Sequence, residues 1–326
     1  MTRFRAFLTS ASRWRWALPA LVAAGLAFAL LAESYPIINS YTQFVLITVG
    51  INIILSASLN LVNGYMGEFS VGHAGFMSLG AYASAVMTTK WLPDTSWAFF
   101  PSVLFGGTVA ALIGFLLALL SFKTRGDYLA IITLAFLMIV KSAFENIPYV
   151  GGPRGLLGID KHTTLVWALF WVVITLWVIR NLVYSKFGRA VVAIREDEIA
   201  ANAMGVRTRE AKILAFVVSS FFGGVAGALF AHQIQFINPS SFDIIKSTEI
   251  LVMVYLGGVG SLAGSILGAV IFTFLAQALQ PLGTWRMVIM PLILVFLMLF
   301  RPRGIMGLRE LAWFLPVREL SKRPGA

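Results

Sequence analysis

The chain has 326 residues, of which 59% are hydrophobic and 12% are charged, and its mean hydropathy is +0.85. Soluble domains carry about 25% charged residues, so this composition excludes a soluble protein and is typical of a polytopic membrane protein. The net charge is +11, and the chain has three scattered histidines and no cysteine. The lack of cysteine excludes disulfides and thiol nucleophiles, and we expect neither a metal site nor a catalytic residue.

The first apolar run, Ala17 to Ala32, follows four arginines. A basic start, an apolar run and small residues also fit a cleaved signal peptide, but many apolar segments follow, so an uncleaved first span is favoured. We therefore expect residues 1–16 to be a cytoplasmic N-terminus, residues 17–300 a membrane domain, and residues 301–326 a cytoplasmic tail.

Nine further apolar segments follow along the chain. They are Tyr41–Val62, Val71–Thr89, Trp97–Phe122, Tyr128–Phe144, Thr163–Ile179, Ile213–Ala231, Ile250–Val259, Leu262–Leu279 and Met287–Phe300. A helix needs about 20 apolar residues to cross the hydrocarbon core, and several of these segments are short or rich in glycine. We predict an all-α polytopic membrane protein of about ten transmembrane or re-entrant helices.

The basic residues are distributed as a ten-crossing topology requires. Four precede Ala17, two follow Phe122, seven lie from Arg180 to Lys212, and six follow Phe300; the opposite side receives five of the 25. Cytoplasmic loops of membrane proteins are enriched in lysine and arginine, so both termini are predicted to be cytoplasmic. The dispersed charge indicates contact with membrane lipid and excludes nucleic acid as a partner.

The longest polar stretch, Ser185 to Lys212, is predicted to be a cytoplasmic helix. Small or apolar residues recur at helical spacing, and Gly205 supplies a left-handed stop after Met204. The apolar positions are Ala190, Ala193, Ile194, Ala201 and Met204, and the charged turn is Arg195, Glu196, Asp197 and Glu198. Two interpretations stay open: a helix that binds a groove on a soluble partner, or a solvated connecting loop.

Two segments, Asn63–Tyr82 and Leu256–Ala269, are rich in glycine and hint at an internal repeat. Such segments form either broken helices, whose free backbone groups can contact a solute, or closely packed helices that contact no solute. Candidate pathway residues in or near them are Asn60, His73, Gly257 and Gly258. His73 fits a proton relay, and it also fits a histidine bonded to a neighbouring backbone carbonyl.

Lys141 and Glu145 are two further candidates for the pathway. They stand four residues apart, so on a helix they share a face and could neutralise each other beside a polar passage; alternatively, the lysine extends toward the interface. An ion-coupled carrier would use these two residues with His73 and Glu68. The sequence has no phosphate-binding loop and no hydrolase motif, so any ATP-driven work requires a separate subunit, and a membrane-embedded enzyme is disfavoured.

Several motifs carry a resemblance to a known family. They are NGYMGEFSVGHAGFMSLGAY (63–82), RGDYLAIITL (125–134), GGPRGL (151–156), GRAVVAIREDEIAANAMG (188–205), the segment 256–269 ending in LGA, and RPRGIMG (301–307). On these motifs the chain resembles the LivM-like permease family of bacterial branched-chain amino acid ABC importers over nearly its whole length. Ser265 departs from the family pattern, which has proline there.

The resemblance implies a permease subunit in the bacterial inner membrane, without an ATPase site or cofactor of its own. It implies a second homologous permease, two cytoplasmic subunits that bind ATP, and a periplasmic binding protein that delivers leucine, isoleucine or valine. The segment Gly188–Gly205 would be the ATPase-coupling helix, carried by Gly188, Arg189, Arg195, Glu196, Asp197, Glu198 and Gly205. Urea, short amides and aromatic acids, which sister systems handle, stay open as substrates.

Overall fold

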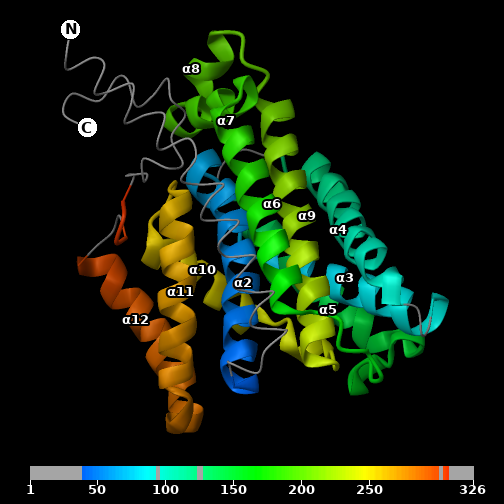
Figure 1. The fold of residues 1–326 in the computed structure, drawn as a ribbon. Helices are drawn as coiled ribbons and strands as arrows, with labels where there is room; N and C mark the ends of the chain where they lie inside the picture. The colour runs from blue at the N-terminus through cyan, green and yellow to red at the C-terminus, as the bar shows by residue number, and fades with distance from the viewer. Residues whose placement is uncertain (1–38, 93–95, 123–127, 301–303, 308–326) are drawn as a thin grey trace, which may run out of the picture.

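The computed structural model describes residues 39–92, 96–122, 128–300 and 304–307. The predicted first span, the motif residues 125–127 and most of the predicted C-terminal tail lie outside these ranges. Throughout the described part the chain forms helices joined by short connections (Figure 1), which confirms the predicted all-α polytopic fold.

Five helices are long and apolar enough to cross a membrane. They are α2 with its continuation (Ser40–Met66), α4 (Phe99–Ser121), α5 (Tyr128–Asn146), α6 (Leu165–Tyr184) and α9 (Thr208–Ile234). The shorter helices are α3 (His73–Val86), α10 (Ile244–Gly257), α11 (Leu262–Ala278) and α12 (Arg286–Phe300). Each predicted segment within the described residues therefore contains a helix, although α9 and α10 begin several residues before the predicted starts.

Helices α2 and α9 form the interior of the bundle. α2 packs against α6, α9, α10 and α11, and α9 also packs against α3 and α4. The most apolar window of α2 is 89% buried and that of α9 is 67% buried, whereas only about a third of α4, α5 and α6 is buried. Figure 1 shows α2 between α10–α12 on one side and α6 and α9 on the other, so the outer helices present their apolar faces to lipid.

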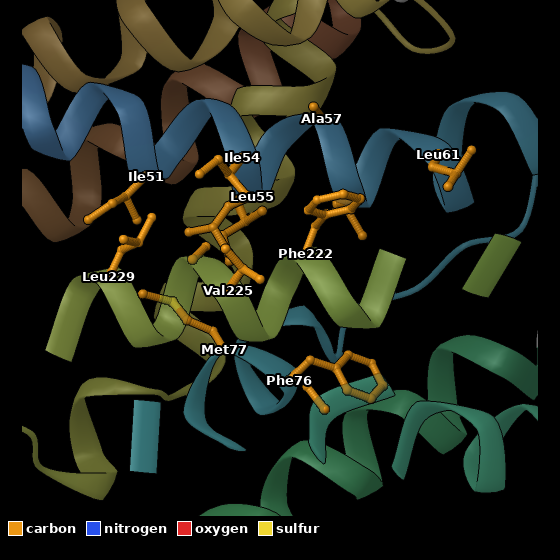
Figure 2. Packing of buried hydrophobic residues seen from close by; sticks show 14 of the residues in the cluster. Ile51, Ile54, Leu55, Ala57, Leu61, Phe76, Met77, Phe222, Val225 and Leu229 are labelled. Carbon is orange, nitrogen blue, oxygen red and sulfur yellow. The ribbon is translucent and has the colours of Figure 1, made fainter. Parts of the chain in front are cut away.

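Branched side chains of α2 pack between the helical turns of α9. Figure 2 shows Ile54 and Leu55 facing Val225 and Leu229, with Met77 of α3 on the far side of α9. Small residues bring α9 and α3 even closer, because a side chain at Gly80 would overlap the backbone of Gly224. This contact follows the rule that small residues permit close approach of helices in membranes.

The helical conformation is interrupted between α2 and α3. α2 widens into a π-helical turn, Leu61–Met66, and Gly67 then adopts a left-handed conformation with φ +77°. The non-helical segment 67–72, called the break loop below, leads to α3. Asn63 closes this loop: it accepts a hydrogen bond from Ser70 N at 3.2 Å and donates one to Ser70 O at 3.3 Å. Of the predicted glycine-rich segment Asn63–Tyr82, only the break loop is non-helical.

The second glycine-rich segment is a hairpin between α10 and α11. The helices meet closely at Gly257, where an added side chain would overlap the backbone of Gly264. Residues 304–307 cover the end of α10, because Ile305 N donates to Leu256 O at 3.0 Å and Met306 N donates to Gly257 O at 2.9 Å. Of the two arrangements considered for a glycine-rich segment, broken helices or closely packed helices, α10 and α11 show close packing.

Candidate functional site

The predicted cytoplasmic helix is in fact two helices, α7 (Lys186–Glu196) and α8 (Glu198–Ala203), at one end of the bundle (Figure 1). The prediction of one helix was wrong because Asp197 leaves the helical conformation and caps α8. Its carboxylate accepts hydrogen bonds from Ile199 N at 2.8 Å and Ala200 N at 3.0 Å. Gly205 follows α8 with φ +83°, as predicted for a left-handed stop.

One face of this segment packs onto the bundle. Gly188, Val191 and Ile194 of α7 and Ala201 of α8 are buried. Gly188 lies so close to the end of α6 that a side chain there would overlap the carbonyl groups of Leu182 and Val183. The predicted coupling residue Arg189 lies on the exposed face.

The same segment also exposes large apolar side chains. Phe187 is 57% exposed, Ile199 is 79% exposed and Met204 is 85% exposed. The spacing predicted that Met204 shares one helical face with Ile194 and Ala201; the structure separates them, because α8 ends before Met204 and the other two residues are buried. A short segment that exposes three large apolar side chains and also the carboxylates of Glu196 and Asp197 is suited to contact with a protein partner.

Arg195 points into the molecule and not toward solvent. Its Nη1 donates a hydrogen bond to the carbonyl oxygen of Gly64 at 3.2 Å, and its Nη2 pairs with Glu196 Oε1 at 2.5 Å. Gly67 lies against the same arginine, because a side chain on Gly67 would meet Arg195 Cγ at 2.6 Å. α7 therefore rests directly on the end of α2 and on the break loop.

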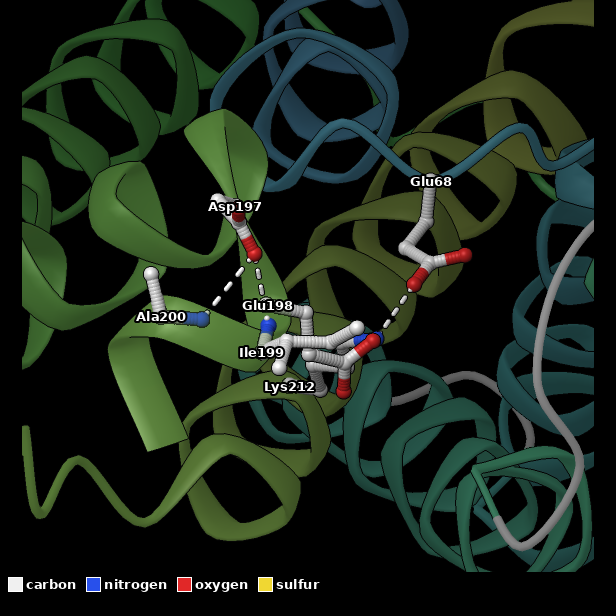
Figure 3. A network of polar contacts seen from close by, with 6 residues as sticks. All are labelled: Glu68, Asp197, Glu198, Ile199, Ala200 and Lys212. Carbon is white, nitrogen blue, oxygen red and sulfur yellow. Dashed lines mark hydrogen bonds and ion pairs between the residues drawn. The ribbon is translucent and has the colours of Figure 1, made fainter. Parts of the chain in front are cut away.

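A second link joins α8 to the break loop through Lys212 of α9. The lysine Nζ lies 2.5 Å from Glu68 Oε1 of the break loop and 2.8 Å from Glu198 Oε2 of α8. Figure 3 shows the Glu68 carboxylate directed toward the end of Lys212, where the Glu198 carboxylate also lies. Sequence analysis did not single out Lys212, since it belongs to a charged stretch and gains its partners only through the fold.

Asn60 joins the end of α2 to the α10–α11 hairpin. Its Nδ2 donates to Ser261 O at 2.9 Å and to Ser265 Oγ at 2.7 Å, with a longer contact to Gly258 O at 3.4 Å. Its Oδ1 accepts from Gly260 N at 2.8 Å. Three of the predicted pathway residues, Asn60, Gly257 and Gly258, are therefore neighbours at this junction.

His73 is buried at the start of α3, and its Nε2 lies 2.8 Å from Ser58 Oγ of α2. The partner of this nitrogen is therefore a hydroxyl on another helix and not the neighbouring backbone carbonyl considered above. The backbone oxygen of Ser58 in turn accepts a hydrogen bond from Ser219 Oγ of α9 at 2.6 Å. His73 thus belongs to a polar contact among three helices.

Lys141 pairs with Asp243, at 2.9 Å, and this corrects the pairing with Glu145 considered above. Asp243 precedes α10 and caps it through Ile244 N. The Lys141 ammonium group, followed by the Ile244 amide, holds the pKa of the Asp243 carboxyl below its usual value. This ion pair is separated from the Asn60 junction by the whole of α10, so the six predicted pathway residues do not form one cluster.

The described fold and this site define a class. A bundle of long apolar helices, with a helical segment at one end that rests on an interrupted helix, is typical of the membrane-spanning subunit of a transporter. The chain belongs to the family of permease components of branched-chain amino acid transport systems, whose model matches residues 41–300.

Two groups of relatives agree with this assignment. The high-affinity branched-chain amino acid transport system permease proteins LivM of Escherichia coli K12 and of Salmonella typhimurium LT2 are each 32% identical to this chain; each alignment covers 86% of it and 73% or 74% of the relative. The corresponding permease protein LivH of Salmonella typhimurium is 25% identical over 79% of this chain and 91% of its own length. No solved structure matches the chain significantly.

Proposed function

We propose that this protein is the translocating permease subunit of an ATP-driven importer of leucine, isoleucine and valine in a bacterial inner membrane. Its partners are a second homologous permease, two cytoplasmic ATPase subunits and a periplasmic binding protein, and both of its termini lie in the cytoplasm. Membership of the permease family and the similarity to both LivM and LivH support this proposal. The ATPase subunits bind and hydrolyse ATP, and this chain needs no cofactor.

The observation that carries the proposal is the α7–α8 segment. It projects from the bundle, exposes Ile199 and Met204, and contacts the interruption between α2 and α3 through Arg195. A self-sufficient ion-coupled carrier has no need of such a segment. Short amphipathic helices bind grooves on soluble partners through side chains of this kind.

In the proposed mechanism, ATP closes the paired ATPases and displaces α7 and α8. The displacement reaches the break loop and the α10–α11 hairpin, so that a pathway near Asn60, His73 and Gly258 opens alternately to the two sides of the membrane. Lys141 and Glu145, on α5, lie along the outer part of this pathway. An apolar route with a few amide and carbonyl groups suits a solute that has a small apolar side chain and a zwitterionic end.

The test is affinity purification of the tagged protein from its native membrane in mild detergent, followed by reconstitution into vesicles. We expect two ATPase subunits and a second permease to co-purify in stoichiometric amounts, and ATP to drive uptake of labelled leucine when the binding protein is added. Competition by isoleucine and valine, and not by urea, short amides or aromatic acids, assigns the substrate class. Purification of the chain alone, with uptake driven by an ion gradient in the absence of ATP, would overturn the proposal.

A further inference from the structure

Lys212 connects two segments that are distant in the sequence. Its ammonium group lies between Glu198 of α8, the segment assigned to the ATPases, and Glu68 of the break loop. The lysine side chain is only 7% exposed, whereas those of Glu68 and Glu198 are 21% and 47% exposed. A nearly buried cation thus holds one carboxylate from each segment (Figure 3).

The electrostatics of this trio favour joint movement of its members. If α8 moved away alone, the buried ammonium group would lose one of its two carboxylates, and leaving a buried charge without its partner is strongly unfavourable. If the lysine were absent, two carboxylates would face each other without a countercharge. If the ammonium group at the end of the long lysine side chain follows Glu198, it keeps both carboxylates only when Glu68 moves too, so the lowest-energy displacement of α8 is one in which the break loop follows.

Neighbouring contacts support the same direction of movement. Arg195, at the end of α7, donates a hydrogen bond to the Gly64 carbonyl, which precedes Gly67 in the chain. Gly67 also lies against the Arg195 side chain, so α7 contacts the start of the break loop as well. The backbone of Lys212 belongs to α9, which packs along α3 immediately after the break loop, so the lysine side chain reaches both segments from a third helix. The π-helical turn before the break loop and Glu68 at the start of the loop are thus both connected to the segment assigned to the ATPases.

We propose that Lys212 is a positioning residue that transmits the displacement of α8 to the break loop. Its ion pair with Glu198 connects it to α8, and its ion pair with Glu68 connects it to the break loop. This inference rests on the proposed function. It assigns Lys212 no contact with the solute; the lysine acts by making the opening of the α2–α3 break obligatory when the ATPases move. Disruption of the trio therefore separates ATP hydrolysis from transport.

The first test measures leucine uptake and ATP hydrolysis by the reconstituted complex with its co-purified partners. We expect Lys212→Met to lower the amount of leucine transported per ATP hydrolysed by about tenfold, within the range of ordinary coupling between sites. Lys212→Arg keeps the charge and is expected to restore most of the ratio. Lys246→Met is the matched control, because Lys246 pairs with Glu249 inside a single helix, α10.

Lys212→Met could fail to fold, so the single changes Glu68→Gln and Glu198→Gln provide a second set of variants. Each of them leaves the lysine paired with one carboxylate. Although the two glutamates lie on different segments, both changes are expected to lower the ratio by similar factors. A merely structural role would lower complex yield and ATP hydrolysis together and leave leucine transported per ATP unchanged, and that result would overturn the inference.

The second test observes the break loop directly. The chain has no cysteine, so Phe69→Cys, at a position 43% exposed in the break loop, introduces a single thiol whose modification is followed on this chain by mass spectrometry. We expect a non-hydrolysable ATP analogue to change the modification rate in the Phe69→Cys complex and to have no effect once Lys212→Met is added. An equal nucleotide response in both would overturn the role of Lys212. ATP-independent uptake by the unaltered protein would instead overturn the proposed function, and this inference with it.

Discussion

The side chains of Asn60 and Ser265 are hydrogen-bonded at 2.7 Å, although 205 residues separate them in the chain. The bond fastens the end of α2 to the first turn of α11, beside the hydrogen bonds from Asn60 to Ser261 O and from Gly260 N to Asn60. Asn60 is completely buried, so none of these groups can be satisfied by solvent if the amide is removed.

We expect Asn60→Ala to lower the stability of the protein by about 3 kcal/mol and Ser265→Ala by about 1 kcal/mol, since each unsatisfied buried polar group costs roughly 1–3 kcal/mol. The measurement is the thermal midpoint of unfolding of the purified protein in detergent. Asn202→Ala, at an exposed position on α8, serves as the control and is expected to leave the midpoint unchanged. Equal effects of Asn60→Ala and Ser265→Ala would contradict the central role given to the amide.

Two glycine-to-alanine changes separate close packing from backbone conformation. A side chain on Gly64 would overlap the Asn60 side chain and the backbone of Gly260, whereas nothing lies within 4 Å of the same position at Gly205. Gly205 has φ +83°, so Gly205→Ala should cost only the left-handed strain of about 1–2 kcal/mol.

Gly64→Ala must displace the hairpin, and we expect it to reduce stability by more than about 3 kcal/mol, at the upper end of overpacking effects. The yield of monodisperse protein on size-exclusion chromatography, together with the thermal midpoint, measures both changes. A Gly64→Ala protein as stable as Gly205→Ala would show that the hairpin does not press on α2 in this way.

The Lys141–Asp243 ion pair predicts a pH dependence of stability. Because its pKa is lowered in the folded protein, Asp243 contributes stability that is fully present above its unfolded pKa of about 3.9 and is lost as the pH falls through the lowered folded value. We expect Asp243→Asn to be less stable than the unaltered protein at about pH 6, by less than about 1 kcal/mol given the partial exposure of the pair. The difference should shrink below about pH 3.9.

The effect is measured as the thermal midpoints of unfolding of Asp243→Asn and of the unaltered protein between about pH 6 and about pH 3. Glu210→Gln is the control, because its partner Arg207 is 81% exposed and the pair is solvated. A gap between Asp243→Asn and the unaltered protein that stays constant down to about pH 3 would rule out the carboxylate as its source.

Helices were predictable from the sequence because long apolar runs in lipid must satisfy their backbone groups internally. The starts of α9 and α10 were not, since a charged residue precedes each predicted apolar run: Lys212 in α9, whose partners are distant in the sequence, and Lys246 in α10, which pairs with Glu249. The division of α7 from α8 had a local signal: Asp197 is a favoured N-cap residue, and its charged neighbours concealed it.

The pairings within the site could not be predicted from spacing. Lys141 and Glu145 stand at helical distance, yet the partner of Lys141 is Asp243, 102 residues further on, because packing of α5 beside the start of α10 brings that carboxylate nearer. The same kind of contact makes Arg195 and Asp197 unsuitable positions at which to test binding of the ATPases. Arg195 and Asp197 hold the Gly64 carbonyl and cap α8, so replacing them would unfold the segment before it tested partner binding.

Ile199 and Met204 are the better positions at which to test contact with the ATPases. They are 79% and 85% exposed, so Ile199→Asp and Met204→Asp should leave the thermal midpoint of this chain unchanged. Burial of a large apolar side chain at an interface contributes about 1.5–3 kcal/mol, so each change is expected to weaken ATPase binding by about tenfold or more. The readouts are the amount of ATPase recovered with the tagged protein and ATP-driven uptake, and Asn202→Asp on the same helix is the control. Full recovery of the ATPases with both aspartate variants would mean that α8 lies outside the interface, and the contact would then have to be sought around the exposed Phe187 of α7.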